Sequence, residues 1–528
     1  MPGSVASFNE DNYGLREHWK VLAMMTLVSL STFQYGLDFG IIGGLQAMVG
    51  FLKVFGEPAP ETPLGYNLSA ERQQLISSLM TLGAFISSST AGFTALVFGR
   101  KMSLWIACAM VFGSTALMQA TTSIAGLYAG RLIIGFGNGL LMTHSQLYIH
   151  ETSPAKYRGL AISAFLYWTS VGTLVGTVID NFTQRIETKN SYIISLGIVH
   201  VVPVILTVGL FFIPESPRWL LDRGHEAKAE RALERIRPRG WDTRTEFDQM
   251  KAALEAERLI ATSVGIVDIF KNPIDRRRTF LSIASVTSQA ASGSMFMIAY
   301  GTYFLAMAGI GDPFGNSCIL IGCGVAAIII NSIVTTRYGY RRVMLMSGLL
   351  LCGVCQLIIA VVYTVEPGTK KTGQLIVAFA VIYIVGYNGM ISSYAWLGGG
   401  EFPSQRLRSY TFGIATAIGF FAAWVTTFTA PYFINPAELN WGPKYGYIWA
   451  PICVLTAAWV FFFFPETKDR TLEQIDEMFE ARLPARKFRG YNCTRTAANA
   501  HAVAEEKVSE DEKVQHVTVD EQVEDSRV

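Results

Sequence analysis

A single acidic side chain interrupts an otherwise charge-free segment near the start of the chain. Asp38 is the only Asp, Glu, Lys or Arg within residues 21–52. A charge at the centre of a bilayer costs about 2.5–3.5 kcal/mol on the insertion scale, so Asp38 there requires a cationic partner or a bound proton. The alternative places Asp38 near a helix end, where its carboxylate reaches the interface. We favour the first interpretation and predict a proton-binding site at Asp38.

Residues for metal or enzymatic chemistry are scarce. Nearly all of the seven cysteines lie in apolar stretches, and Cys352-Gly-Val-Cys355 has no second Cys or His pair nearby. The apolar segments contain no metal-ligand cluster and no nucleophile–base pair, and the chain has no ATP-binding loop. We therefore predict that the protein is not an enzyme, has no metal and no cofactor, and draws on an ion gradient or works downhill.

The long charge-free segments set the architecture that positions Asp38. Of the 528 residues, 51% are hydrophobic and 16% are charged, against about 25% charged in ordinary soluble domains. Backbone groups in lipid are satisfied within helices, and transmembrane strands would be about half as long as these segments. We predict an all-α integral membrane protein with twelve transmembrane helices, formed by 21–52, 73–99, 102–130, 132–150, 159–179, 190–214, 279–311, 313–336, 343–365, 372–400, 409–437 and 445–465.

Loop charges predict the orientation of these helices. With the N-terminus inside, the cytoplasmic short loops carry eleven Lys and Arg against seven outside, and the 215–278 connection adds fourteen. The outer loops then contain two sequons, so Asn67 and Asn181 are candidate glycosylation sites. No cleavable signal peptide is visible at the N-terminus.

The 215–278 connection divides the helices into two groups of six. We predict a cytoplasmic N-terminal tail (1–20), an N-terminal bundle (21–213), a cytoplasmic linker with amphipathic helices near 225–236 and 246–260 (214–278), a C-terminal bundle (279–464) and a cytoplasmic tail (465–528) that is disordered after about 498.

Three short motifs recur in the second half of the chain. Gly99-Arg-Lys recurs as Gly339-Tyr-Arg-Arg, 240 residues later. Glu151-Thr-Ser-Pro-Ala-Lys-Tyr-Arg158 recurs as Glu401-Phe-Pro-Ser-Gln-Arg-Leu-Arg408, and Pro214-Glu-Ser-Pro-Arg218 recurs as Pro465-Glu-Thr-Lys-Asp-Arg470. The repeats predict two pseudo-symmetric bundles, an architecture of secondary transporters.

These motifs resemble those of the sugar porters of the major facilitator superfamily. Pro214-Glu-Ser-Pro-Arg-Trp-Leu220, Pro465-Glu-Thr-Lys-Asp-Arg-Thr-Leu-Glu473 and Gly130-Arg131 with Glu151-x-x-Pro-x-x-x-Arg158-Gly159 carry the resemblance. The segment from Gln289-x-x-x-Gly293 to Tyr300-x-Thr-Tyr-Phe304, with Pro431-Tyr432, Asn440-Trp-Gly-Pro-Lys444 and Phe479-Glu480 to Phe488, resembles the fungal α-glucoside and maltose-type permeases.

The resemblance implies a role for each matching residue. The helix-1 acid Asp38 pairs with the helix-4 residue Arg131 for proton coupling. Glycines at 36, 40 and 44 form a close-packing face on helix 1. Ion pairs at the cytoplasmic helix ends gate transport, and the positions concerned are Arg100, Glu151, Arg158, Arg341, Glu401 and Arg408.

The implied substrate is a small sugar. Amide, hydroxyl and aromatic groups suit its OH groups and C–H face, and the candidates are Gln289, Trp396, Tyr300, Phe420 and Asn388. Several polar positions of the family's hexose site are replaced here, among them by Leu166, Ala290, Met295 and Gly324, which favours a disaccharide or α-glucoside over free glucose.

From the family resemblance and the departures from the family's hexose site, we expect a monomeric importer in a fungal plasma membrane. It takes up a sugar by proton symport and alternating access. The alternatives are a non-transporting sugar sensor on the same fold, and a transporter of a quinate-like acid or secondary metabolite.

Overall fold

The computed structural model describes residues 16–238, 240–263, 267–309, 311–468, 470 and 472–493. Within these ranges only the backbone is described for 155–166, 256–263, 335–338, 405, 409 and 473. The Arg158 side chain and the predicted disordered tail lie outside the described part.

The first half of the chain is helical apart from a short hairpin. The hairpin pairs Glu57 with Asn67 in antiparallel register. The elements are α1 (Trp19–Leu45), α2 (Val49–Phe55), β1 (Glu57–Pro58), β2 (Tyr66–Asn67), α3 (Ala70–Ala120), α4 (Ile124–Thr152), α5 (Ala155–Thr183), α6 (Asn190–Val199) and α7 (Val201–Phe212).

The linker forms four helices, and the second half repeats the helical pattern with more interruptions. The linker helices are α8 (Pro217–Asp222), α9 (Glu226–Ile236), α10 (Thr243–Ser263) and α11 (Asp268–Lys271). The second half contains α12 (Pro273–Ala291), α13 (Ser294–Met307), α14 (Pro313–Tyr338), α15 (Arg341–Val365), α16 (Lys370–Gly386), the π-helix η2 (Tyr387–Ser392), α17 (Ser393–Glu401), η3 (Gln405–Leu407), α18 (Arg408–Ile434), η4 (Gly442–Tyr445), α19 (Gly446–Phe463), α20 (Leu472–Glu480) and η5 (Ala485–Gly490).

The described helices give twelve membrane spans, as the sequence predicts. Eight continuous helical segments are long and apolar enough to cross a bilayer. One of them, α3, comprises two helices joined at Gly99, whose φ of 82° is non-helical. The pair α1 and α2, which meet at a 78° bend, passes the same test together. The remaining predicted spans correspond to α5 and to the broken pair α12 and α13.

The boundary expected between the third and fourth spans was wrong. The charge-free segments 102–130 and 132–150 place it at Arg131, but α3 ends at Ala120 and α4 begins at Ile124. The intervening loop is uncharged, and the Ser123 hydroxyl caps α4 by accepting a hydrogen bond from the Gly126 N–H. Arg131 lies inside α4, so its charge marks a buried contact and not a loop.

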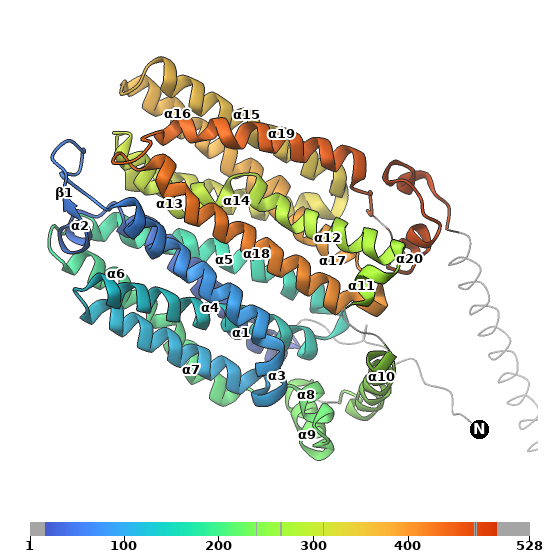
Figure 1. The fold of residues 1–528 in the computed structure, drawn as a ribbon. Coiled ribbons are helices and arrows are strands. Elements are labelled where there is room, and N and C mark those ends of the chain that lie inside the picture. The colour runs from blue at the N-terminus through green and yellow to red at the C-terminus, as the bar shows by residue number, and fades with distance from the viewer. Residues whose placement is uncertain are drawn as a thin grey trace, which may run out of the picture.

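The two halves have separate hydrophobic cores and lie side by side (Figure 1). Between them, α3 packs against α18 and α5 packs against α14. We call the end of the molecule with α2 and the β-hairpin the hairpin end, and the opposite end, with α8, α9, α10 and α20, the linker end.

Candidate transport site

A buried ion pair joins α1 to α4. Arg131 donates from a guanidinium nitrogen to Asp38 Oδ1 at 2.8 Å, and the two side chains are 0% and 1% exposed. Arg131 Nε also donates to the Ile76 carbonyl at 2.9 Å, and Asn138 Nδ2 lies 3.4 Å from Asp38 Oδ2. Each charge is therefore neutralised by the other in a place closed to water, and the helix-end alternative for Asp38 does not describe this structure.

The glycine face of α1 brings α5 into close contact. A Cβ at Gly36 would lie 1.9 Å from the Thr169 carbonyl oxygen, and one at Gly40 would lie 2.4 Å from that of Thr173. Any larger residue would therefore separate the two backbones. This contact fixes the position of Asp38, which lies between the two glycines.

A second buried carboxyl lies at the same contact between α1 and α5, nearer the hairpin end. Asp180 of α5 is 0% exposed, and a Cβ at Gly44 would lie 2.1 Å from its Oδ2. Asp180 was not predicted as a site residue, because it directly follows the charge-free segment 159–179 and adjoins Asn181, which was expected in an outer loop.

The seventh span is broken beside the predicted substrate residue Gln289. Between α12 and α13, Gly293 has φ of 80°, and a Cβ there would lie 2.7 Å from the Trp449 ring. The Tyr383 hydroxyl donates to the Ser292 carbonyl at 2.9 Å, and the Tyr387 hydroxyl donates to Gln289 Oε1 at 3.3 Å. Two tyrosines from the tenth span thus hold the break and the Gln289 side chain.

The tenth span is irregular at the same level. Its π-helical segment η2 contains Asn388, and such segments are frequent at functional sites. Asn388 is half-buried, and a Cβ at Gly324 of α14 would lie 2.6 Å from its amide nitrogen. Trp396 on α17 is half-buried and meets Phe412 edge-on at 6.0 Å, and Phe420 on α18 is also half-buried.

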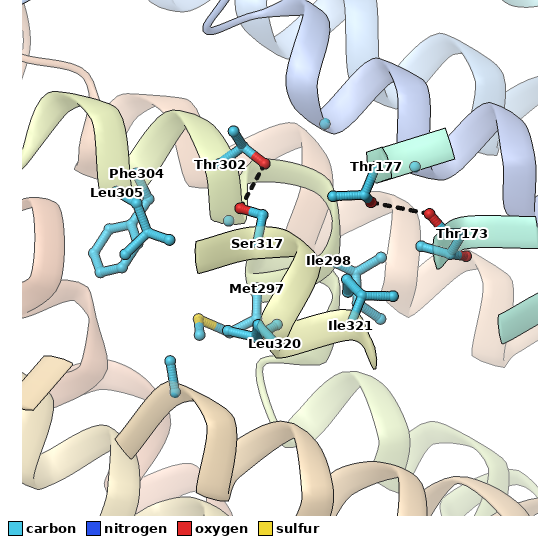
Figure 2. A pocket seen from close by; sticks show the side chains of 14 residues that line it. Thr173, Thr177, Met297, Ile298, Thr302, Phe304, Leu305, Ser317, Leu320 and Ile321 are labelled. Carbon is cyan, nitrogen blue, oxygen red and sulfur yellow. Dashed lines mark hydrogen bonds between the residues drawn. The ribbon is translucent and has the colours of Figure 1, made fainter. Parts of the chain in front are cut away.

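A small cavity lies between the halves, lined by α1 and α5 on one side and α13, α14 and α16 on the other (Figure 2). The hydroxyls of Thr302 and Ser317 are hydrogen-bonded on its wall at 2.9 Å, and Thr177 donates to the Thr173 carbonyl at 2.9 Å. None of the five predicted substrate residues lines this cavity.

At the hairpin end, hydrogen bonds connect the two halves. Asn67 Nδ2 donates to Asn435 Oδ1 at 3.0 Å, and the Tyr303 hydroxyl donates to Asn67 Oδ1 at 2.8 Å. Asn435 Nδ2 in turn donates to the Leu68 carbonyl at 2.8 Å. We call Asn67, Asn435 and Tyr303 the hairpin-end latch.

The latch changes the interpretation of two predicted residues. Asn67 is 7% exposed and its amide is engaged, so it is not available as a glycan acceptor in this structure. Asn181 is partly exposed and stays a predicted acceptor. Tyr300 is fully buried, donates to the Thr427 carbonyl of its own half and lies close to the Ser77 hydroxyl of the other half, so that both Tyr300 and Tyr303 meet the first half.

At the linker end, each half contains the same polar cluster. In the first half, Glu151 accepts from Arg100 at 2.6 Å and from the Ser216 hydroxyl at 2.5 Å. In the second half, Glu401 accepts from Arg341 at 3.1 Å and from the Thr467 hydroxyl at 2.5 Å. The recurring sequence motifs therefore meet in space, and each ion pair lies within one half.

A further glutamate completes each cluster by capping a helix. Glu215 accepts from the backbone N–H groups of Arg100 and Lys101, and Glu466 accepts from those of Arg341 and Arg342, at 2.9–3.2 Å. Carboxylates favour such helix starts. Burial raises the pKa of Glu215, against the opposing effect of these N–H donors. Arg408 is the first residue of α18 and lies near Arg278. None of the described contacts joins Arg408 to Glu401.

Comparison with known proteins identifies the fold and the family. The model of the family described as sugar (and other) transporter matches residues 24–479. The chain belongs to this sugar transporter family.

Relatives of this sugar transporter are fungal and bacterial. It is 27% identical over 476 residues to the major facilitator-type transporter ecdD of Aspergillus rugulosus, covering 87% of each chain. It is 28% identical over 500 residues to the maltose permease MAL61 of Saccharomyces cerevisiae, covering 93% of this chain and 81% of the permease. The inward-open structure of the xylose transporter XylE from E. coli has a TM-score of 0.70 at 20% identity, covering 86% of this chain and 99% of that one, which shows the major facilitator fold.

The family and the geometry together show what kind of molecule this is. It is a multi-pass membrane transporter and not an enzyme, and it resembles the fungal maltose permeases. The structure brings together Asp38 with Arg131, Arg100 with Glu151, and Arg341 with Glu401. Among the residues that were not predicted, Asn435 carried no signal because it lay inside the predicted span 409–437, and Tyr303 lay inside the quoted motif beside Tyr300, which was chosen.

Proposed function

We propose that this sugar transporter imports a disaccharide, an α-glucoside or a hexose by proton symport and alternating access. The observation that carries the proposal is the buried Asp38–Arg131 pair between α1 and α4, in a fold whose family transports sugars. A proton that binds to Asp38 can change the packing of α1 against α4, because it removes the charge that Arg131 contacts.

The Asp38–Arg131 pair couples the proton to a conformational change. While Asp38 is ionised, its charge attracts Arg131 at 2.8 Å in a medium of low dielectric. A proton on Asp38 removes that attraction, so that α1 is no longer held to α4 by an ion pair. The free energy difference between the two protonation states then biases the conformation of the first half.

The sugar binds in the second half, at the irregular helices. Gln289, held by Tyr387 at the break in the seventh span, and Asn388 on the π-helical segment supply amide groups for sugar hydroxyls. Trp396 and Phe420 supply aromatic faces for the C–H face of the ring, and Tyr300, bonded to the Thr427 carbonyl, closes the site on the hairpin-end side. Broken helices near the membrane midplane are a usual location of substrate sites in transporters.

The two ends of the molecule gate access alternately. We place the linker end, both termini and the 214–278 linker on the cytoplasmic side of the plasma membrane, and the hairpin end on its outer side. The excess of Lys and Arg in the linker-end loops supports this orientation. The hairpin-end latch then closes the outer side. The Arg100–Glu151 and Arg341–Glu401 clusters stiffen the cytoplasmic helix ends of each half, and the family resemblance assigns Arg158 and Arg408 to the same gating network.

Uptake by yeast cells that lack their own sugar carriers tests the proposal. Labelled maltose and labelled glucose are supplied in separate assays at pH 5, with and without a protonophore, to cells expressing the wild-type protein or Asp38→Asn, with surface expression measured for each. Concentrative uptake of either sugar that both treatments abolish is the expected result. Uptake that is unaffected by the protonophore and by Asp38→Asn overturns proton symport. Failure of both sugars at normal surface expression overturns the proposed substrate class.

A further inference from the structure

Asp180 is a buried carboxyl that the proposed cycle does not yet use. It lies one turn before the end of α5, at the hairpin-end side of Asp38, and is 0% exposed. Among the described residues, neither of its carboxylate oxygens makes a hydrogen bond within 3.5 Å, no ion pair includes it, and the one donor close to it is the neutral Ser195 hydroxyl.

Every helix packed against Asp180 presents neutral or acidic groups. On α1 it faces Gly44, and the nearest ionisable residue of that helix is Asp38, already paired with Arg131. On α6 it faces the Ser195 hydroxyl, which is bonded to Thr183 at 2.9 Å, and the Tyr192 ring points to Phe51 instead. On α14 it faces Cys318, whose thiol contacts the Thr177 carbonyl at 3.6 Å, with Asp312 beyond.

This environment selects a proton as the ligand. An ionised carboxylate without a cation or a donor is costly in such a place, and binding a proton removes the charge. A Cβ at Gly44 would lie 2.1 Å from Asp180 Oδ2. The space beside this oxygen is therefore too small for a cation larger than a proton. We propose that Asp180 is a second proton-binding carboxyl, which takes a proton from the hairpin-end side before Asp38 does. This inference rests on proton symport as the proposed function.

The cavity in Figure 2 lies next to the helix segments that carry the two carboxyls, although neither Asp38 nor Asp180 lines it. Its wall includes Thr177, one turn before Asp180 on α5, and Gly43, next to Gly44 on α1. Gly40, two residues from Asp38, also lines the cavity. The six residues from Asp38 to Gly44 span about 9 Å of helix, too far for direct transfer. The cavity has room for a water molecule or two, and the hydroxyls of its wall offer such waters hydrogen bonds.

Infrared spectroscopy of the purified full-length protein, without any sugar, tests proton binding directly. A protonated carboxyl absorbs separately from an ionised one. We expect the wild-type protein at pH 7 to show a protonated-carboxyl band that Asp180→Asn removes. Asp312→Asn is the matched control, because Asp312 is exposed and Asn caps a helix start as well as Asp does. This control should leave the band unchanged. If Asp180→Asn does not fold, Asp38→Asn protein labelled with 13C-aspartate replaces it, and the band must persist without Asp38 and shift with the label.

Transport measurements then test whether this proton takes part in the cycle. In proteoliposomes, Asp180→Asn should exchange labelled for unlabelled maltose or glucose within about twofold of wild type, since its amide imitates the neutral acid. It should lose at least tenfold in accumulation driven by a proton gradient. An absent or unchanged infrared band overturns the inference, and so does normal accumulation by Asp180→Asn. Failure of the proposed symport would appear separately, as a wild-type protein that does not respond to the proton gradient.

Discussion

The two halves of this transporter share their linker ends but differ in the middle of the membrane. At the linker end, Glu151 and Glu401 make matching bonds to an arginine and to a hydroxyl. In the middle, the first half has glycine-packed continuous helices and the Asp38–Arg131 pair, whereas the second half has a broken seventh span and a π-helical tenth span.

This difference shows how a duplicated scaffold can divide its work. The shared clusters keep the motifs that the sequence repeats, because both halves need rigid helix ends. The middle of each half has diverged, with charge chemistry in one and irregular backbone with amides and aromatic rings in the other. Regular, closely packed helices suit a buried ion pair, while helix breaks expose polar groups to a substrate.

The largest expected effect on stability comes from removing one partner of the buried Asp38–Arg131 pair in the first half. Arg131→Gln leaves Asp38 buried without a cation, and such changes typically cost about 3–5 kcal/mol of stability. Asp38→Asn with Arg131→Gln together should cost less than the sum of the two single changes. Denaturation of the purified variants in detergent measures this, and strictly additive losses would contradict a direct interaction.

A second test separates α1 from α5. Gly36→Ala places a methyl group where 1.9 Å is available to the Thr169 carbonyl, so we expect a loss of about 1–3 kcal/mol and reduced proton-driven uptake. Gly113→Ala on α3 is the matched control, because its methyl would meet nothing within 4 Å. Equal thermal stability of the two variants would show that the α1–α5 contact is looser than described.

A third test straightens the seventh span of the second half. Gly293→Ala forces a left-handed conformation on an L-residue, which costs about 1–2 kcal/mol, and also presses on Trp449. We expect weaker sugar binding, because Gln289 moves with the break. Gly301→Ala, with nothing within 4 Å, is the control for stability. Unchanged sugar affinity in a folded Gly293→Ala protein would separate the break from the substrate site.

A fourth test opens the hairpin-end latch. Asn435→Ala removes its hydrogen bonds to Asn67 and Leu68, each worth about 1 kcal/mol. The protein should then populate the outward-open state more, measured as faster labelling of a cysteine introduced at Thr302. Glu438→Ala is the control, since Glu438 is exposed in the same loop and is not part of the latch. Faster labelling in this control as well would assign the effect to the loop and not to the latch.

The smallest effect concerns the caps at the linker end. Because burial raises the pKa of Glu215 above its ordinary value of 4.5, its ionisation costs stability as the pH rises through the raised pKa. The stability of the wild-type protein relative to Glu215→Gln should therefore fall between the ordinary pKa of the unfolded chain and the raised pKa of the folded protein. Below and above these two pKa values it should not change with pH. Thermal unfolding at a series of pH values measures the difference, and the opposite slope would mean that the N–H donors outweigh burial.

Much of this fold follows from the sequence, because long charge-free segments in lipid permit helices only. The repeated motifs also predicted the linker-end clusters, since matching residues in a duplicated fold occupy matching places. Charge was a poor guide where it was buried. Charge-free segments alone stopped at Arg131 and just before Asp180, although both residues lie inside helices, and only the family resemblance placed Arg131 on the fourth helix. The latch was beyond prediction because Asn67 and Asn435 are 368 residues apart and meet only through the packing of two halves.

The central claim, that the first half handles the proton and the second the sugar, is most directly tested by comparing two fluxes in Asp38→Asn and Gln289→Ala. Proteoliposomes containing each variant are assayed for equilibrium exchange of labelled sugar and for accumulation driven by a proton gradient, with maltose and glucose as probes. We predict that Asp38→Asn keeps exchange and loses accumulation, whereas Gln289→Ala loses both. Accumulation that survives Asp38→Asn, or exchange that survives Gln289→Ala unchanged, would contradict the division of work between the halves.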